Sequence, residues 1–172
     1  MQKTLTLMIS LIKLCGFKIG ISWHSFSTFN GKTRSLNTDQ LSKIVKCSNV
    51  NFINIQYGNV LKQIKEVKLL SGKDILKVPF TDITRDINSL ASIIKKCDLI
   101  ISVDNSTAHL SASLGHPTWI LLPYSADFRW MEEITPAIWY KKTTLIRQEK
   151  ENDWDSLVEL VYSAIENSQL NK

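Results

Sequence analysis

The stretch from Cys97 to Leu122 most constrains how this chain can fold. Leu99–Val103 is a short, apolar, β-rich run, typical of a strand buried on both faces. After a polar break, Ala108–Leu114 continues as a helix of small and apolar residues. Gly115 is expected to end that helix, and Thr118–Leu122 has the composition of a second buried strand. This order predicts two parallel strands joined by a right-handed helical crossover.

The rest of the chain shows the same alternation of strands and helices. The further strands expected are Lys18–Ser22, Asn51–Gln56, a weaker Ile75–Phe80, and Thr143–Arg147. The helices expected run from the N-cap Asn37 to Cys47, over Val60–Val67, from the N-cap Asp86 to Ile94, and over Asp153–Asn167. We therefore predict an α/β fold, a Rossmann-like parallel sheet with helices on both faces.

A single domain is expected over residues 17–168, because a chain of 172 residues can bury about 70% of its unfolded surface. Residues 1–16 are expected to form an amphipathic helix or the remnant of a linker, since apolar residues recur at helical spacing between Leu5 and Ile12. A signal peptide is the less favoured interpretation, because Lys13 interrupts the apolar run. No segment has the length expected of a transmembrane helix.

The net charge and the cysteine content exclude some classes of function. The net charge is +5, and no basic run alternates with aromatic residues, so no nucleic-acid partner is expected. The charge suits an anionic ligand or an acidic membrane face but requires neither. The three cysteines lie far apart without metal-binding spacing, so we expect neither a metal site nor a disulfide framework. A cytoplasmic location is expected, with peripheral association to an inner membrane as the alternative.

Polar loops gather at one edge of the predicted sheet. Ligands of parallel α/β sheets bind beyond the carboxyl ends of the strands. The loops expected at this edge are Trp23–Leu36, Gln56–Asn59, Pro79–Asp86, Asp104–Thr107 and Pro123–Trp130. The first of them is unusually long, and long loops in compact domains are usually functional. We expect the functional site at this edge.

The polar break Asp104–Thr107 is the first candidate site. Its backbone amides would point at an anion from the first turn of the helix, and the Ser106 and Thr107 hydroxyls can donate to phosphate oxygens. His109 follows within one turn and can face the same anion. A purely structural interpretation has equal weight: Asp104 is a helix N-cap, and His109 is a hydrogen-bonded core histidine.

Neighbouring loops supply weaker candidates. The first loop carries Lys32 and Arg34, which could neutralise a diphosphate, although taken alone the loop is better explained as a solvated basic surface. Gln56 could contact a base edge or cap its turn. Aromatic residues around Trp130 could stack on a sugar or base, or form a packed lid.

Several familiar catalytic motifs are absent from the sequence. No nucleophile has a paired His at a recognisable spacing, and there is neither a Walker loop nor a G-x-G-x-x-G. A receiver-like signalling domain would need an acidic pair after the first strand. Because Trp23 and His24 stand there instead, we discount that class.

The run SVDNSTAHLSASLGHPTWILLPYSADFRW resembles glycosyltransferase family 9, the heptosyltransferase family. It is most similar to the family-9-like domains at the C-terminal end of bacterial tetratricopeptide-repeat proteins. The resemblance covers about residues 17–165, through KIGISWHS, KTRSL, FINIQYG, DINSLASIIKKCDLIISVD and WYKKTTLIRQEKENDWDSLV. Asn105 departs from the family pattern, which usually has Thr or Ser at that position.

The resemblance implies the C-terminal, donor-binding half of a GT-B glycosyltransferase. It implies a nucleotide-diphosphate sugar as substrate, without a cofactor or a metal, and a catalytic base in an N-terminal acceptor domain or subunit. The nucleotide-sugar-binding residues expected are Trp23, Lys32, Arg34, Gln56, Asp104, Asn105, Ser106, Thr107 and His109. The alternative is a non-catalytic nucleotide-sugar-binding or partner module.

Overall fold

The computed structural model describes residues 14–79, 81–131 and 137–170. The strands are β1 (Phe17–Ser22), β2 (Val50–Asn54), β3 (Ile75–Leu76), β4 (Leu99–Val103), β5 (Thr118–Leu122) and β6 (Thr143–Arg147). The helices are α2 (Thr38–Val45), α3 (Leu61–Ser71), α4 (Ile87–Ile94), α5 (Ser106–Ser113) and α6 (Trp154–Leu170), with a 3-10 turn η1 (Phe128–Trp130). These elements form the predicted α/β fold.

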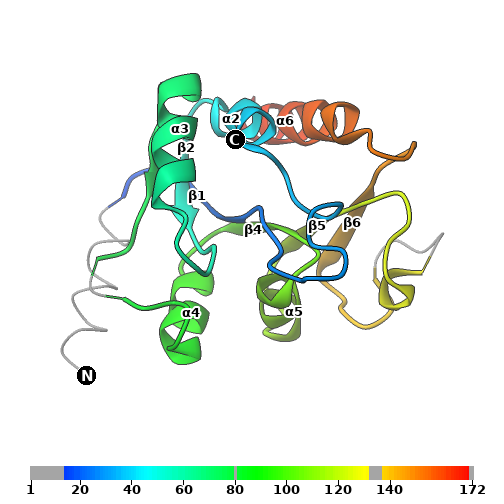
Figure 1. Ribbon diagram of the computed structural model, residues 1–172. Helices are drawn as coiled ribbons and strands as arrows, with labels where there is room; N and C mark the ends of the chain where they lie inside the picture. The colour runs from blue at the N-terminus through cyan, green and yellow to red at the C-terminus, as the bar shows by residue number, and fades with distance from the viewer. Residues whose placement is uncertain (1–13, 80, 132–136, 171–172) are drawn as a thin grey trace.

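All six strands are parallel and lie in the order β3-β2-β1-β4-β5-β6. Helices α2, α3 and α6 lie above the sheet in Figure 1, and α4 and α5 lie below it. The chain moves outward in one direction from β1 and in the opposite direction from β4, so the strand order reverses between these two neighbours. In doubly wound sheets, the crevice at this reversal is where ligands bind.

Apolar side chains on each face of the sheet explain why the helices pack there. Ile19 and Ile21 of β1 lie in the larger core with the buried faces of α2 and α6. On the other face, Ile53 and Ile100 pack with residues of α4. Strand β4 is buried along its whole length, as its continuous apolar run predicts.

The predicted helix ends are confirmed at three positions. Asn37 and Gln40 form a reciprocal capping box at the start of α2. Asp86 caps α4 by accepting two backbone N–H groups. Beyond α5, Gly115 has φ +66°, a left-handed conformation that glycine adopts without steric cost.

Other predicted bounds need correction. Strand β3 is only two residues long, Ile75–Leu76, and does not extend toward Pro79, which cannot donate to a sheet ladder. Helix α5 begins at Ser106 rather than Ala108, because the residue before it is an effective cap. The helix expected over residues 1–16 lies mostly outside the described residues.

The three cysteine thiols are free. Cys15 is exposed just before β1, whereas Cys47 and Cys97 are buried. Burial raises the pKa of each of these two thiols to about 12. No helix in the described part of the chain has the length and apolar character needed to cross a membrane.

Candidate functional site

Asn105 is the centre of a buried hydrogen-bond network at the reversal between β1 and β4. Its side-chain nitrogen donates to Ser22 Oγ at 2.8 Å and to the His24 carbonyl at 3.1 Å. Its side-chain oxygen accepts from the amides of Thr107 and Ala108 at 2.9 and 3.2 Å. One side chain therefore caps α5 and fixes α5 to the end of β1.

Gln56 extends this network to the end of β2. Its Oε1 accepts from Ser22 Oγ at 3.0 Å and from the amides of Trp23 and His24 at 2.9 and 2.8 Å. Its Nε2 donates to the Tyr57 carbonyl at 3.1 Å. Gln56 is fully buried, and both its side-chain oxygen and its side-chain nitrogen are hydrogen-bonded. The structure therefore favours the turn-capping interpretation over contact with a base edge.

The long loop after β1 is closed on itself and ends in an ion pair. A backbone hydrogen bond of 2.9 Å joins Leu36 N to the Trp23 carbonyl. Arg34 then reaches Asp104, with Nη1 2.7 Å from Oδ2. The two side chains are only 13% and 1% exposed. Arg34 Nε is buried and has no partner among the described residues. The pair therefore fixes the loop to the end of β4, and each charge offsets the other.

Glycine is required where this loop turns most tightly. A Cβ on Gly31 would lie 2.4 Å from the carbonyl oxygens of both Ser25 and Ser27. The Gly31 amide donates to the Ser27 carbonyl at 3.0 Å. This close backbone packing sets the path of the three residues that follow, and so places Arg34.

His109 lies on α5 between the ion pair and a group of aromatic rings. Its ring stacks on Trp130 with centroids 4.8 Å apart, and its Nδ1 lies 3.1 Å from the Tyr140 hydroxyl. Its Nε2 is 3.9 Å from Asp104 Oδ1. Burial lowers the pKa of His109 below its usual value, while the Asp104 carboxylate opposes that shift. The imidazole is therefore mainly neutral near pH 7.

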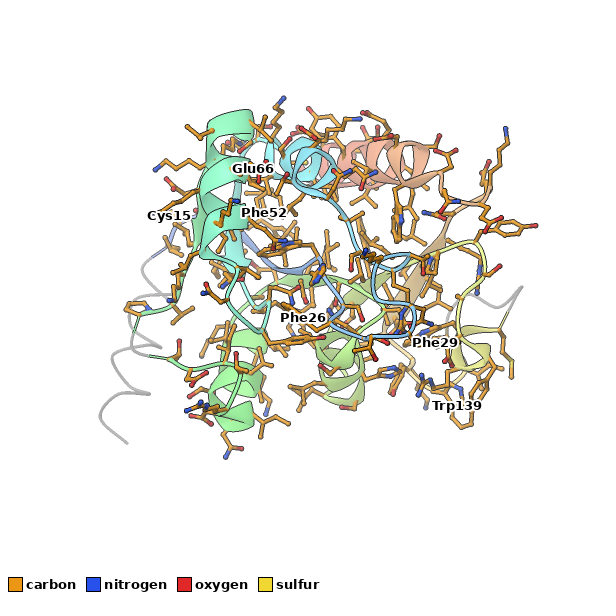
Figure 2. The ribbon with its side chains drawn as sticks, in the orientation of Figure 1. Cys15, Phe26, Phe29, Phe52, Glu66 and Trp139 are labelled. Carbon is orange, nitrogen blue, oxygen red and sulfur yellow. The ribbon has the colours of Figure 1, made fainter. Side chains whose placement is uncertain are left out.

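A pocket of about 480 Å³ opens beside His109. Its other lining residues are Arg129, Trp130, Trp139 and Tyr140. Trp130 is buried, and its Nε1 has no partner within the described part of the chain. Trp139 is 63% exposed and lies at the margin of the molecule in Figure 2. The pocket thus combines aromatic walls with several hydrogen-bonding groups.

A second hollow of about 220 Å³ lies on another face of α5. Its lining includes Ser106, Thr107 and, from the neighbouring loops, Tyr57, Thr84 and Arg85. Thr107 is 1% exposed, and its hydroxyl has no partner among residues 14–79, 81–131 and 137–170. The same hollow is also lined by Ile83, Ile87, Leu90 and Leu110, and the first turn of α5 lies between it and the aromatic pocket.

The structure brings together most of the residues singled out in the sequence. Arg34, Gln56 and the segment from Asp104 to His109 meet at the carboxyl ends of β1, β2 and β4. The other two candidates are placed differently. The Trp23 indole is buried in the larger core and donates to Gln63 at 3.1 Å, so its side chain does not face this edge. Lys32 is exposed on the loop surface.

The first turn of α5 differs from its prediction in two ways. The N-cap is Asn105 rather than Asp104, whose carboxylate is directed to Arg34 instead. The Thr107 amide, expected to face an anion, donates to that cap. Among the candidate polar residues of this turn, Ser106 is the exposed one.

Sequence reasoning missed Trp139 and Tyr140 as residues of the pocket beside His109. Both lie after the described 3-10 turn, in a segment whose aromatic content was the available signal. Within the described ranges, no group of three or more His, Cys, Asp or Glu side chains could hold a metal ion.

Comparisons with known proteins identify the fold. No protein-family model matches the chain. It is 26% identical over 151 residues to Protein FlbA of Caulobacter vibrioides. The aligned region covers 87% of this chain and 25% of that protein. A solved structure described as a glycosyl transferase of family 9, from Veillonella parvula, superposes with a TM-score of 0.67 at 13% identity, covering all of this chain. Escherichia coli ADP-heptose LPS heptosyltransferase II superposes with a TM-score of 0.62 at 13% identity, covering 98% of this chain.

These likenesses establish a fold shared with glycosyltransferase family 9 structures. The chain spans 52% of each of the two solved structures and a quarter of the length of FlbA.

Proposed function

We propose that this chain is the donor-binding half of a metal-independent glycosyltransferase that uses a nucleotide-diphosphate sugar. The position of Asp104–Thr107 carries the proposal, because it follows β4 at the strand-order reversal, where doubly wound sheets bind nucleotides. Two structures of the same fold are named as a glycosyl transferase and an ADP-heptose heptosyltransferase, which supports this reading of the site.

In this proposal the donor diphosphate lies at the start of α5. The exposed Ser106 supplies a donor, and the helix dipole adds about 0.3–1 kcal/mol. The Thr107 hydroxyl is buried and has no partner among the described residues, so it donates to the ligand only if the first turn shifts. Asp104 holds Arg34 in place, so its remaining guanidinium N–H groups are oriented before a ligand arrives. Preoriented donors stabilise the charge that develops on a leaving diphosphate without reorganisation during the reaction.

The acceptor and the catalytic base would come from another part of the enzyme. The proposed partner is an N-terminal acceptor domain or subunit, completing a GT-B enzyme of which this chain would be the C-terminal half. Association with tetratricopeptide repeats and a cytoplasmic location, or a peripheral one at an inner membrane, belong to the same proposal. The 52% coverage of the two solved structures supports this division.

Calorimetry tests donor binding directly. We expect the chain to bind a nucleotide-diphosphate sugar from a panel of UDP, GDP, ADP and dTDP sugars. His109→Ala should weaken that binding several-fold, because it removes an imidazole between Asp104 and the aromatic pocket. Lys68→Ala, on α3, is the control and should bind normally. Absence of binding by the wild-type chain across the panel would contradict the proposal.

A second candidate function is a nucleotide-sugar-binding module without catalysis. The observation that favours it is that Asp104, the one carboxylate among the candidate site residues, is already paired with Arg34 and is not free to act as a base. Turnover separates the two functions. A chain that binds donor but releases no free nucleotide, even with the intact N-terminal half and acceptor present, is a binding module.

A further inference from the structure

We infer that the aromatic pocket beside His109, lined by Arg129, Trp130, Trp139 and Tyr140, receives the sugar ring of the donor, and that the nucleoside lies on the other side of α5. This inference rests on the proposed function and assigns the two ends of the donor to two different hollows. It adds Trp139 and Tyr140 to the site as specificity-determining residues for the sugar.

The walls of the pocket suit a sugar ring. A pyranose presents C–H groups on its faces and hydroxyls around its edge, so it is bound by an aromatic face with polar groups at the rim. Trp139 supplies an exposed indole, and Tyr140 supplies a ring whose hydroxyl lies 3.1 Å from His109 Nδ1. A pocket of about 480 Å³ is large enough for one such ring.

The polar groups of the pocket match the hydroxyls of a sugar. Trp130 lines the pocket with its ring, while its Nε1 is buried and has no partner among the described residues, so a sugar hydroxyl reaches this donor only if the pocket wall shifts. The Arg129 guanidinium is held by Asp127, with Nε 2.8 Å from Oδ1. The neutral imidazole of His109 can accept or donate.

The opposite side of α5 suits the nucleoside better. The hollow at Ser106 and Thr107 adjoins a second hollow of about 230 Å³, with which it shares Ile83 and Thr84. Together they offer hydroxyls and charged groups, including Lys77 and Asp82, for ribose hydroxyls and a base edge. A diphosphate at the start of α5 then joins the two ends of the donor.

The test compares each nucleotide sugar with its own nucleoside diphosphate. Wild-type chain, Trp139→Ala, Trp139→Phe and the control Leu69→Ala are titrated by calorimetry with the UDP, GDP, ADP and dTDP sugars and with UDP, GDP, ADP and dTDP. Leu69 is 87% exposed on α3, away from the pocket, so its variant controls for loss of an exposed apolar side chain. Circular dichroism and thermal unfolding check that each variant is folded.

We expect Trp139→Ala to weaken binding of the nucleotide sugar about ten-fold, because one stacking contact is lost. Binding of the free nucleoside diphosphate should change less than two-fold, and Trp139→Phe should regain most of the lost affinity. Leu69→Ala should match the wild type for both ligands.

Two results would overturn the inference while leaving the proposed function standing. Equal weakening of the sugar nucleotide and the free diphosphate by Trp139→Ala would place the nucleoside in this pocket. Unchanged affinity for both ligands would place neither end of the donor there. If the wild-type chain bound no ligand of either set, the proposed function would fail, and this inference with it.

Discussion

The two sides of the strand edge differ in how their polar groups are satisfied. Around Asn105 and Gln56, buried donors and acceptors bind one another at 2.8 to 3.2 Å. Around Trp130, by contrast, the indole N–H has no partner within the described residues, and Trp139 is exposed. The first side is a completed network that fixes α5 and the end of β2 to the end of β1. The second presents the exposed Trp139 indole to a ligand, and the Arg34–Asp104 pair lies between the two.

This contrast indicates where substitution harms the fold and where it harms binding alone. A satisfied buried network contributes to stability because removing one member leaves the others without partners. An open pocket contributes little to stability, so its side chains can be chosen for a ligand. We therefore expect substitutions in the completed network to lower the free energy of unfolding.

The largest effect is expected from Arg34→Met. It leaves the Asp104 carboxylate buried without its partner and should lower the free energy of unfolding by about 3–5 kcal/mol. Urea unfolding followed by circular dichroism measures the change. Lys43→Met, which removes an exposed ion pair with Asp155, is the matched control and should have almost no effect.

The double variant Arg34→Met with Asp104→Asn sharpens this result. Because it removes both charges together, its loss of stability should be smaller than the sum of the two single losses. If Arg34→Met costs less than about 1 kcal/mol, the pair behaves as a surface ion pair, and the loop is not fixed by it.

A smaller loss, of about 2–4 kcal/mol, is expected from Asn105→Ala. The change removes the cap of α5 and also leaves the Ser22 hydroxyl and the His24 carbonyl without this donor. Asn37→Ala is the matched control, since it removes a cap that has no such network and should cost about 1 kcal/mol. Equal losses for the two variants in urea unfolding would show that Asn105 is only a cap.

The smallest effect is expected from pH. Burial lowers the pKa of His24, His109 and His116 below the ordinary 6.5, so the unfolded chain binds more protons than the folded one below that pH. Stability is therefore complete above about pH 6.5 and declines as the pH falls toward the lowered values. The free energy of unfolding should decrease between pH 7.5 and 5.5.

His109→Gln should make this decline shallower, because one of the three histidines no longer takes up a proton on unfolding. An unchanged slope would show that His109 does not contribute. The titration of Asp86 and Glu166 does not overlap this pH range. Hydrogen bonds from Ser89 and Ser48 hold the pKa values of Asp86 and Glu166 below their usual values, so their contribution is lost only at more acidic pH.

Local sequence patterns were sufficient to predict most of the strands and helices. Leu99–Val103, Thr118–Leu122 and Thr143–Arg147 have the predicted bounds, because each is a short β-rich run with turn-forming or polar neighbours. The apolar stripe on α6, from Trp154 to Ile165, is buried as its helical spacing predicts. The signal was weakest at β3, which pairs with β2 over only two residues.

The site was less predictable because its contacts join distant parts of the chain. Arg34 and Asp104 are 70 residues apart, and no local pattern pairs a loop cation with one carboxylate rather than another. The same holds for the bond from Asn105 to Ser22. Trp23 was expected among the nucleotide-sugar-binding residues, but the closed loop turns its indole into the core.

The placement of the cysteines makes the chain convenient for attaching probes. Cys47 and Cys97 are buried thiols whose raised pKa keeps them protonated, whereas Cys15 is exposed. Cys15 precedes β1 and therefore lies at the amino edge of the sheet, whereas Asp104–Thr107 follow the carboxyl end of β4, and Figure 2 shows Cys15 far from Trp139. A maleimide fluorophore or a surface tether would attach at this one thiol and leave the donor edge facing solution.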